Sequence, residues 1–494
     1  MQALSLRPLI LLLSLALISS CARNPVTGKK ELMLMSESQE IALGKQSDPA
    51  IIQQYGLYQD EEMQKFINDR GKEMGAISHL PDLEYTFRIL DSPVVNAFAV
   101  PGGYVYFTRG IMAHFNNEAE FAGVLGHEIG HITARHSAKQ YSAQMLGQLG
   151  LMAGIIASED FRPFASDASQ LLGLLFLKYG RDHESQSDEL GVQYSTAVGY
   201  DAHEMADFFQ TLNRLQQQSG SSIPDFLSTH PNPVNRYNKV HQHSDKAQMG
   251  LDKASLKINR DEYLKLIEGI VYGEDPRQGY TDNFVFYHPE LKFRFPYPQG
   301  WNLHNSPTQV QIVPDDGAAL IILTLSDQKT LEDAANAHVE KYKFNIIDSR
   351  RTRINGFNSY VVLADILPEQ TQGDTSEPKD TDIVRVLNYY IQDGELIYVF
   401  HGMSTKDKFN SHTNSFKQTM NNFKRLTDPA RINVEPTRIV LKKVNRNASL
   451  RSALVSMGAS QKDLEELSII NGMQLEDNVT AGTSLKMFSK TLND

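Results

Sequence analysis

The sequence has very little cysteine and no excess of positive charge. Cys21 is the single cysteine among 494 residues, so no intramolecular disulfide can form. The 48 basic residues are outnumbered by 59 acidic ones, and the formal net charge of −11 leaves no basic footprint for nucleic acid. Beyond the N-terminus, no apolar run is long and clean enough to predict a transmembrane helix. These absences exclude a disulfide-stapled scaffold and disfavour a nucleic-acid-binding or multi-span membrane protein.

The length and the apolar content predict several folded domains. Hydrophobic residues make up 41% of the chain, which is enough to bury several cores. The length predicts two to four domains. Patterns along the chain favour an α+β multidomain protein: a mainly helical first domain with a small β-hairpin, then an antiparallel-sheet domain, then a small βααβ module. The expected boundaries are 21–275, 280–428 and 436–490, after a signal peptide at 1–20.

The N-terminus resembles the leader of a bacterial lipoprotein. Arg7 precedes an apolar run over 8–18, which is too short to span a bilayer but suits a signal peptide. Ile18-Ser19-Ser20-Cys21 resembles a lipobox, so cleavage would leave an acylated Cys21 that anchors the chain stably. Ala22 follows, which by resemblance to Gram-negative lipoproteins implies the outer membrane facing the periplasm. The alternative is a plain secreted protein with an incidental cysteine.

The pentapeptide at 127–131 predicts a metal-binding helix. It reads HExxH, and residues four apart lie on one helical face, so His127 and His131 can hold one metal ion. Glu128 can then take a proton from a metal-bound water. Asn116 or Asn117 can cap the helix N-terminus. The alternative is a helix with two surface histidines and a solvated glutamate.

A third metal ligand is expected downstream of this helix. Catalytic zinc usually has three protein ligands. A metzincin would place Gly and His where this chain has Ala134 and Ser137, and His136 lies one residue early. Glu184 and Asp188 are four apart, so Glu184 can complete a His2Glu site while Asp188 orients a ligand imidazole. Alone, this acidic stretch would be a solvated helix face.

The segment before the HExxH helix predicts a β-hairpin. Residues 94–100 and 104–108 read as strands, and Pro101-Gly102-Gly103 reads as the turn between them. An edge strand beside a metal site can pair with an extended peptide through main-chain hydrogen bonds. An ordinary buried hairpin is the alternative.

Five separated motifs together resemble a known family. They occur in the family's order: Asn96 to Gly103, Thr108-Arg109-Gly110, HExxH with His136, Arg181 to Asp188, and Thr229-His230-Pro231 with Arg236. The resemblance covers about residues 25 to 275. This region resembles the membrane-associated zinc metallopeptidases of the Oma and BepA type, relatives of the CAAX prenyl endopeptidases. One departure is Ser187, where the family usually has Ala.

The resemblance implies a gluzincin fold with one zinc ion. It implies that His127, His131 and Glu184 are the ligands and that Glu128 is the general base. It further implies that His230, on a loop near the site, approaches the metal or stabilises the transition state, and in some relatives such a histidine acts as a gate. Arg236 would hold that loop. A simple His-Pro turn is the alternative for His230.

Two functions follow from these expectations. The first is a zinc-dependent endopeptidase of the bacterial cell envelope that hydrolyses misfolded or misassembled envelope proteins. The second is a periplasmic chaperone or scaffold for outer-membrane protein assembly with latent proteolysis. The apolar runs 145–156 and 171–179 could form a helical lid that touches membrane or client, or pack on the peptidase domain as core.

The middle domain is expected to be an antiparallel α+β fold with a binding or positioning role. Helices are expected over 331–342 and 411–423, and a mobile polar loop over 369–380. Strands are expected over 292–295, 309–313, 320–323, 360–363, 383–387 and 396–400. The pattern resembles the fold shared by Mog1 and PsbP-type proteins.

The last module resembles a LysM unit. A strand at 438–441, helices at 449–457 and 461–471 and a final strand near 485–487 give a βααβ order. LysM modules often bind peptidoglycan, which makes the glycan a candidate partner. The Gly-Asp-Thr start of that family is replaced here by Asn445-Arg446-Asn447-Ala448, which leaves glycan binding open.

Overall fold

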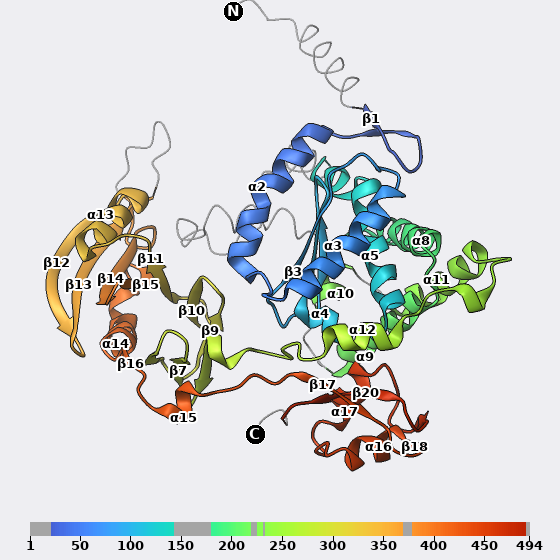
Figure 1. Ribbon diagram of the computed structural model, residues 1–494. Coiled ribbons are helices and arrows are strands. Elements are labelled where there is room, and N and C mark those ends of the chain that lie inside the picture. Colours follow the sequence, from blue (N-terminus) through green and yellow to red (C-terminus); the bar gives the residue numbers. More distant parts are fainter. Residues whose placement is uncertain (1–20, 143–178, 219–224, 231–232, 369–377, 491–494) are drawn as a thin grey trace, which may run out of the picture. The chain divides into compact units, whose positions relative to one another are not determined.

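The computed structural model describes residues 21–142, 179–218, 225–230, 233–368 and 378–490. These residues form two compact units (Figure 1). Among the described residues, the first unit contains the chain up to 274 and again from 437 onward, and the second contains 275–436. Within these ranges, no helix is long and apolar enough to cross a membrane. A helical peptidase-like region followed by a sheet-rich region was expected, and this arrangement is confirmed.

The first unit is built mainly from helices around a small sheet. Its helices before residue 275 include α2 (Glu37–Tyr55), α3 (Glu61–Ala76), α4 (Arg109–His114), α5 (Glu118–Thr133), α8 (Arg181–Ala197), α9 (Glu204–Gln218), α10 (Asp225–Thr229), α11 (Pro233–Ala247) and α12 (Arg260–Ile267), with a 3₁₀ turn η2 at Lys253–Ser255. Its described strands before residue 275 are β1 (Cys21–Arg23), β2 (Lys30–Leu32), β3 (Thr86–Leu90), β4 (Ala97–Val100) and β5 (Tyr104–Thr108). The expected hairpin is β4 and β5, which pair antiparallel, while β3 pairs parallel with β5 on its other side. This order leaves β4 as an edge strand.

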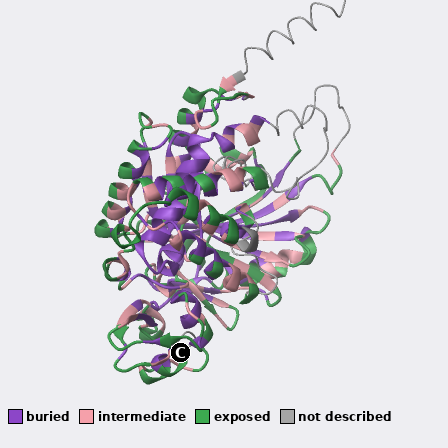
Figure 2. Ribbon diagram, turned by 90° about the vertical axis from the view of Figure 1, so that its right-hand side faces the viewer, coloured by how far each residue is buried: buried purple, intermediate pink, exposed green. Residues whose placement is uncertain are grey.

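The HExxH helix α5 lies at the centre of this unit. Every residue from Glu118 to Thr133 is buried. Figure 2 colours the ribbon by burial, with buried residues in purple. A helix buried on all sides needs close neighbours. Glycines provide the closest approach to α8, because a Cβ on Gly191 would lie 2.9 Å from the carbonyl oxygen of Gly123. The spacing of these two helices is therefore set by backbone contact.

The second unit is a seven-stranded antiparallel sheet with elements on both faces. The strand order is β12-β13-β14-β15-β11-β10-β9, and a second sheet has the order β16-β8-β7-β6. Helix α13 (Leu331–Tyr342) packs on one face, and α14 (Phe409–Met420) packs on the other together with the second sheet. The remaining elements are η3 (Pro276–Gln278), β6 (Tyr280–Asp282), β7 (Val285–His288), β8 (Phe293–Pro296), β9 (Trp301–Asn305), β10 (Gln309–Pro314), β11 (Ala319–Ser326), β12 (Asn345–Ile354), β13 (Phe357–Ile366), β14 (Val384–Asp393), β15 (Leu396–Thr405), β16 (Lys424–Arg425) and α15 (Pro429–Ile432).

The long edge strand β12 has no counterpart among the strands expected from sequence. Residues 345–353 are exposed without interruption, so neither face of the strand packs on a core. A strand without a buried face has no alternation of apolar and polar residues, which is the pattern that reveals strands in a sequence. Strand β12 is held in place by its antiparallel backbone pairing with β13.

The C-terminal module returns to the first unit and shares its hydrophobic core. It consists of β17 (Ile439–Lys443), β18 (Ala448–Ser449), α16 (Leu450–Ser456), α17 (Leu464–Ile470), β19 (Asn478–Val479) and β20 (Ser484–Phe488). Lys486 on β20 is fully buried, and its Nζ donates to the carbonyl oxygens of Ala113 at 3.0 Å and Phe115 at 2.9 Å. Burial lowers the pKa of Lys486 and raises the pKa of the neighbouring buried Glu120. The module is thus anchored where α4 ends and α5 begins.

Lys486→Met should destabilise the first unit, because it keeps the length of the side chain but leaves two buried carbonyl groups without a donor. We expect a loss of about 2 kcal/mol in the free energy of unfolding. Calorimetry of the full chain should show a lower thermal midpoint for this unit, by about 2–4 °C per kcal/mol. Lys443→Met, at an exposed position of the paired strand β17, is the matched control. An unchanged midpoint for Lys486→Met would show that the buried ammonium does not anchor the module.

Candidate metal centre

Helix α5 presents the HExxH residues inside the first unit. Asn117 is its N-cap, and the Asn117 side chain accepts from the backbone N–H of Glu120 at 2.8 Å. The helix continues to Thr133, so His127 and His131 lie one turn apart on one face. Both imidazoles are at most 1% exposed. The alternative of surface histidines does not describe this helix.

Helix α8 brings the acidic residues to the same place. Glu184 and Asp188 are 2% and 1% exposed, so the alternative of a solvated helix face does not hold. The helix begins at Arg181 without a side-chain cap. Its close approach to α5 lets Glu184 reach both imidazoles of the HExxH motif.

Four side chains converge on one point. They are His127, His131, Glu184 and His230, and each offers one ligand atom within 4.8 Å of the others. The Nε2 atoms of His127 and His131 are 3.0 Å apart, and His230 Nδ1 lies 3.2 Å from His127 Nε2. Glu184 Oε1 lies 3.0 Å from His230 Nδ1 and 3.5 Å from His131 Nε2. A tetrahedral metal with bonds of about 2.0–2.1 Å places its ligand atoms about 3.3 Å apart, so this group fits such an ion.

The protonation states of His131 and Glu184 also suit a metal. Burial and the neighbouring imidazoles hold the pKa of His131 well below its usual value, which keeps that ring neutral. Burial alone would raise the pKa of Glu184, but His230 and Arg236 outweigh it and lower that pKa. Metal ligands must be deprotonated, and a neutral imidazole beside an ionised carboxylate meets this condition.

A buried ion-pair network supports the group from behind. Asp188 Oδ1 lies 3.0 Å from His127 Nδ1, the nitrogen that faces away from the other ligand atoms. Arg236 donates to both oxygens of Asp188 at 2.6 and 2.8 Å, and it lies 2.9 Å from Glu184 Oε2. Burial would raise the pKa of Asp188, but Arg236 and His127 outweigh it and hold that pKa below its ordinary value. The structure thus places Asp188 behind the His127 ring, and Arg236 also donates to His230 O at 3.4 Å.

Glu128 lies beside the group without joining it. Its carboxylate is fully buried, and neither oxygen has a hydrogen-bond partner among the described residues. The His230 ring lies close by, with its Nε2 3.7 Å from Glu128 Oε1. Burial raises the pKa of Glu128, which makes this carboxylate a better proton acceptor than an exposed one.

His230 is held at the group by the segment that carries α10. Its N–H donates to Phe226 O at 2.8 Å, and its ring stacks on the Phe226 ring with centroids 4.6 Å apart. The N–H of Phe226 in turn donates to Val95 O at 3.2 Å, just before edge strand β4. A position of His230 near the metal was expected from sequence, whereas this link to the strand segment was not.

Tyr179 was not among the expected site residues. Its ring lies against that of His131 with centroids 4.0 Å apart, and its hydroxyl is 2.9 Å from Ser137 Oγ. The only signal in the sequence was its place at the end of an apolar run. The expected lid segments at 145–156 and 171–178 lie outside the described residues, as do the signal peptide and most of the 369–380 loop.

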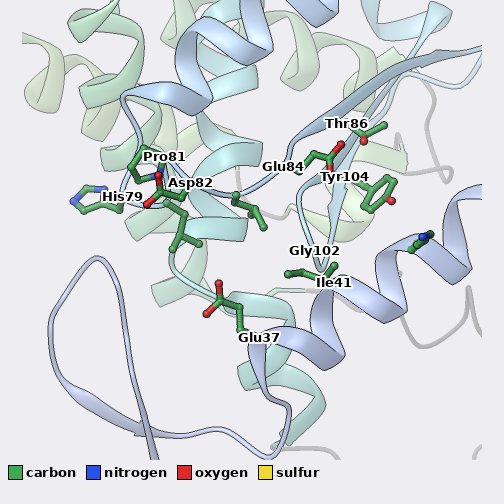
Figure 3. A pocket seen from close by; sticks show the side chains of 12 residues that line it. Glu37, Ile41, His79, Pro81, Asp82, Glu84, Thr86, Gly102 and Tyr104 are labelled. Atoms are coloured by element: carbon green, nitrogen blue, oxygen red, sulfur yellow. The ribbon is translucent and has the colours of Figure 1, made fainter.

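A surface cavity of about 660 Å³ lies elsewhere in this unit. Figure 3 shows Glu37 and Ile41 on α2 facing Gly102 and Tyr104 of the hairpin, with Asp82 on the loop before β3. No member of the four-residue group lines it. The cavity is therefore separate from the candidate metal centre.

The sequence profile of Peptidase family M48 matches residues 61–244. Residues 61–244 are a peptidase M48 domain. This range contains α5, α8, α10 and most of α11, and thus all four converging side chains. M48 is a metallopeptidase family, so a metal ion is implied, and the donor set found here suits one. The resemblance to Oma and BepA-type enzymes is confirmed.

Two similar proteins show how far this likeness extends. The mitochondrial metalloendopeptidase OMA1 of Arabidopsis thaliana is 30% identical over 179 residues, which is 36% of this chain and 35% of that protein. The beta-barrel assembly-enhancing protease of Escherichia coli K12 is 28% identical over 225 residues, covering 43% of this chain and 45% of that protein. The chain thus matches less than half the length of these relatives.

Solved structures also match part of the chain. The match with cyanobacterial PsbP from Synechocystis covers 30% of this chain and 91% of the PsbP chain, at 14% identity and with a TM-score of 0.23. The yeast Ran-binding protein Mog1p covers 31% of this chain and 99% of its own at 13% identity, also with a TM-score of 0.23. Scores this low support no argument about fold or function.

Proposed function

We propose that this chain is a zinc-dependent endopeptidase, with His127, His131 and Glu184 as metal ligands and Glu128 as general base. The buried convergence of these side chains carries the proposal, together with Glu128 beside them, which has no hydrogen-bond partner among the described residues. Two imidazoles and one carboxylate are the donor set of many catalytic zinc sites. When bound, zinc polarises the scissile carbonyl and lowers the pKa of a coordinated water.

The chain's own residues would then have separate roles in hydrolysis. Glu128 takes the proton of the attacking water and delivers it to the leaving amine. Asp188 and Arg236 keep the His127 ring in place while charge develops. Strand β4, at the edge of its sheet, is positioned to pair with an extended peptide. An unfolded polypeptide is the substrate that such an edge selects, because folded proteins seldom offer free main-chain groups.

The proposed location is the bacterial cell envelope, with anchoring through Cys21. The lipobox-like sequence that ends at Cys21 supports the anchor. The relative from Escherichia coli is named for enhancing β-barrel assembly, which supports misfolded or misassembled envelope proteins as substrates. Peptidoglycan remains a proposed partner of the C-terminal module, where residues 445–447 are exposed.

A second candidate function is a chaperone or scaffold with latent proteolysis. The position of His230 favours it, because a catalytic zinc keeps one coordination position for water and His230 supplies a fourth ligand atom. The link from Phe226 to Val95 also engages a carbonyl at the strand segment where a peptide would pair. In this arrangement the segment that carries His230 competes with substrate, and movement of that segment would activate the enzyme.

Glu128→Gln should abolish hydrolysis while the metal stays bound, since the amide cannot accept the proton of water. We expect casein cleavage to fall by about 100-fold or more, because general-base catalysis supplies a factor of that order. Cleavage by the wild type should also stop with a chelator and return with added zinc. Elemental analysis should find one zinc per chain in both proteins. Cleavage by Glu128→Gln at the wild-type rate would remove Glu128 from the mechanism.

His230→Ala should increase casein cleavage, because it frees one position of the metal for water. A shift of about 1.4 kcal/mol toward the open arrangement corresponds to a tenfold rise in rate. Ser228→Ala, an exposed change on the same segment, is the matched control. A fall in rate of about 100-fold would instead make His230 a transition-state donor and contradict the gate.

Cys21→Ala should remove the lipid anchor. Cells grown with labelled palmitate should incorporate label into the wild-type protein but not into this variant, and the variant should leave the membrane fraction. Label that persists in Cys21→Ala would refute acylation at this residue.

A further inference from the structure

His136 lies immediately beyond the end of α5 and turns back toward the metal centre. The residue before it, Arg135, has a φ of 55°, the left-handed conformation that non-glycine residues seldom adopt. Arg135 is held there by a buried ion pair with Glu40, and it also donates to Met35 O at 3.1 Å. This turn directs the fully buried His136 toward the His131 ring.

The nitrogen atoms of His136 have well-defined neighbours. Nδ1 lies 3.1 Å from His131 Nδ1, and Nε2 lies 3.0 Å from the side-chain oxygen of Gln186 on α8. Ser187 Oγ also approaches Nδ1 at 3.2 Å. The His136 ring stacks on His183 with centroids 4.3 Å apart, a contact that leaves both nitrogens free for hydrogen bonds.

With a metal on His131 Nε2, these contacts set the direction of each hydrogen bond. A histidine that offers Nε2 to a metal carries its proton on Nδ1. His131 Nδ1–H therefore donates, and His136 Nδ1 accepts. His136 then carries its own proton on Nε2, which donates to the Gln186 oxygen. Each of the two rings has one possible tautomer in this arrangement.

We propose that His136 is a positioning residue for the metal ligand His131, acting as the hydrogen-bond acceptor that fixes its tautomer and ring orientation. The proposal rests on the metal site of the proposed function. It assigns the two histidine ligands different supports: Asp188, an ionised carboxylate, for His127, and the neutral ring of His136 for His131. Gln186 has the further role of fixing the tautomer of His136.

Asparagine and leucine at position 136 separate hydrogen bonding from packing. The two side chains have nearly the same shape, but only the Asn oxygen can accept where His136 Nδ1 accepts. The measurement is the zinc dissociation constant of the purified full chain, by competition with a fluorescent zinc chelator. The thermal midpoint of the metal-free protein reports whether each variant is folded.

We expect His136→Leu to weaken zinc binding by about 10–100-fold, as for other residues that support a ligand histidine. His136→Asn should stay within about threefold of the wild type, because it restores the acceptor. His183→Leu, which removes only the stacking ring, is the matched control and should also stay within about threefold.

Equal weakening by Asn and Leu would overturn the proposal, because His136 would then act by packing. Wild-type affinity in a folded His136→Leu would overturn it too. If His136→Leu does not fold, the Gln186 variants test the proposal. Gln186→Leu should weaken zinc binding, whereas Gln186→Glu, which keeps an acceptor, should not. Unchanged zinc binding in Gln186→Leu would overturn the proposal. A wild type that binds no zinc would contradict the proposed function itself, which is a different result from any of these.

Discussion

The ion pairs of Arg236 are the interaction on which the candidate metal centre depends. A buried carboxylate without a partner is very costly, and here Glu184 and Asp188 are both buried within one turn of α8. The guanidinium of Arg236 contacts both, and its other face lies over the Phe209 ring at 4.2 Å. The two acids can therefore remain ionised before any metal binds, which a cation-binding site requires.

The fold is arranged so that this charge balance is reached from separate helices. Helix α5 provides the imidazoles of His127 and His131, α8 provides the carboxylates, and α11 provides the arginine. The contact of Gly191 with the backbone of α5 brings the first two helices close enough for Glu184 to touch both histidines. The C-terminal module also supports α5, because Lys486 donates to two carbonyl oxygens that precede this helix. Helix α5 is thereby held at its N-terminal end by a segment more than 300 residues away in sequence.

The sequence predicted those parts of the site that depend on local periodicity. A spacing of four residues places His127 with His131, and Glu184 with Asp188, once each segment is a helix. It could not predict that α5 is buried on every side, because that depends on what packs around it. It also could not place His230 relative to Glu184, since the two are joined through tertiary contacts with Phe226 and Val95. Strand β12 was not predicted because it buries neither face. The packing of the C-terminal module was not predicted either, because a core shared between distant segments leaves no periodic pattern in the sequence.

The proposal to test is that His127, His131 and Glu184 hold one zinc ion, with His230 beside them. Crystals of the full chain grown with zinc, measured above and below the zinc absorption edge, test this claim most directly. We expect a single anomalous peak inside this group, within about 2.0–2.2 Å of the ligand atoms of His127, His131 and Glu184. A peak located elsewhere in the first unit, or a zinc held without Glu184, would contradict it.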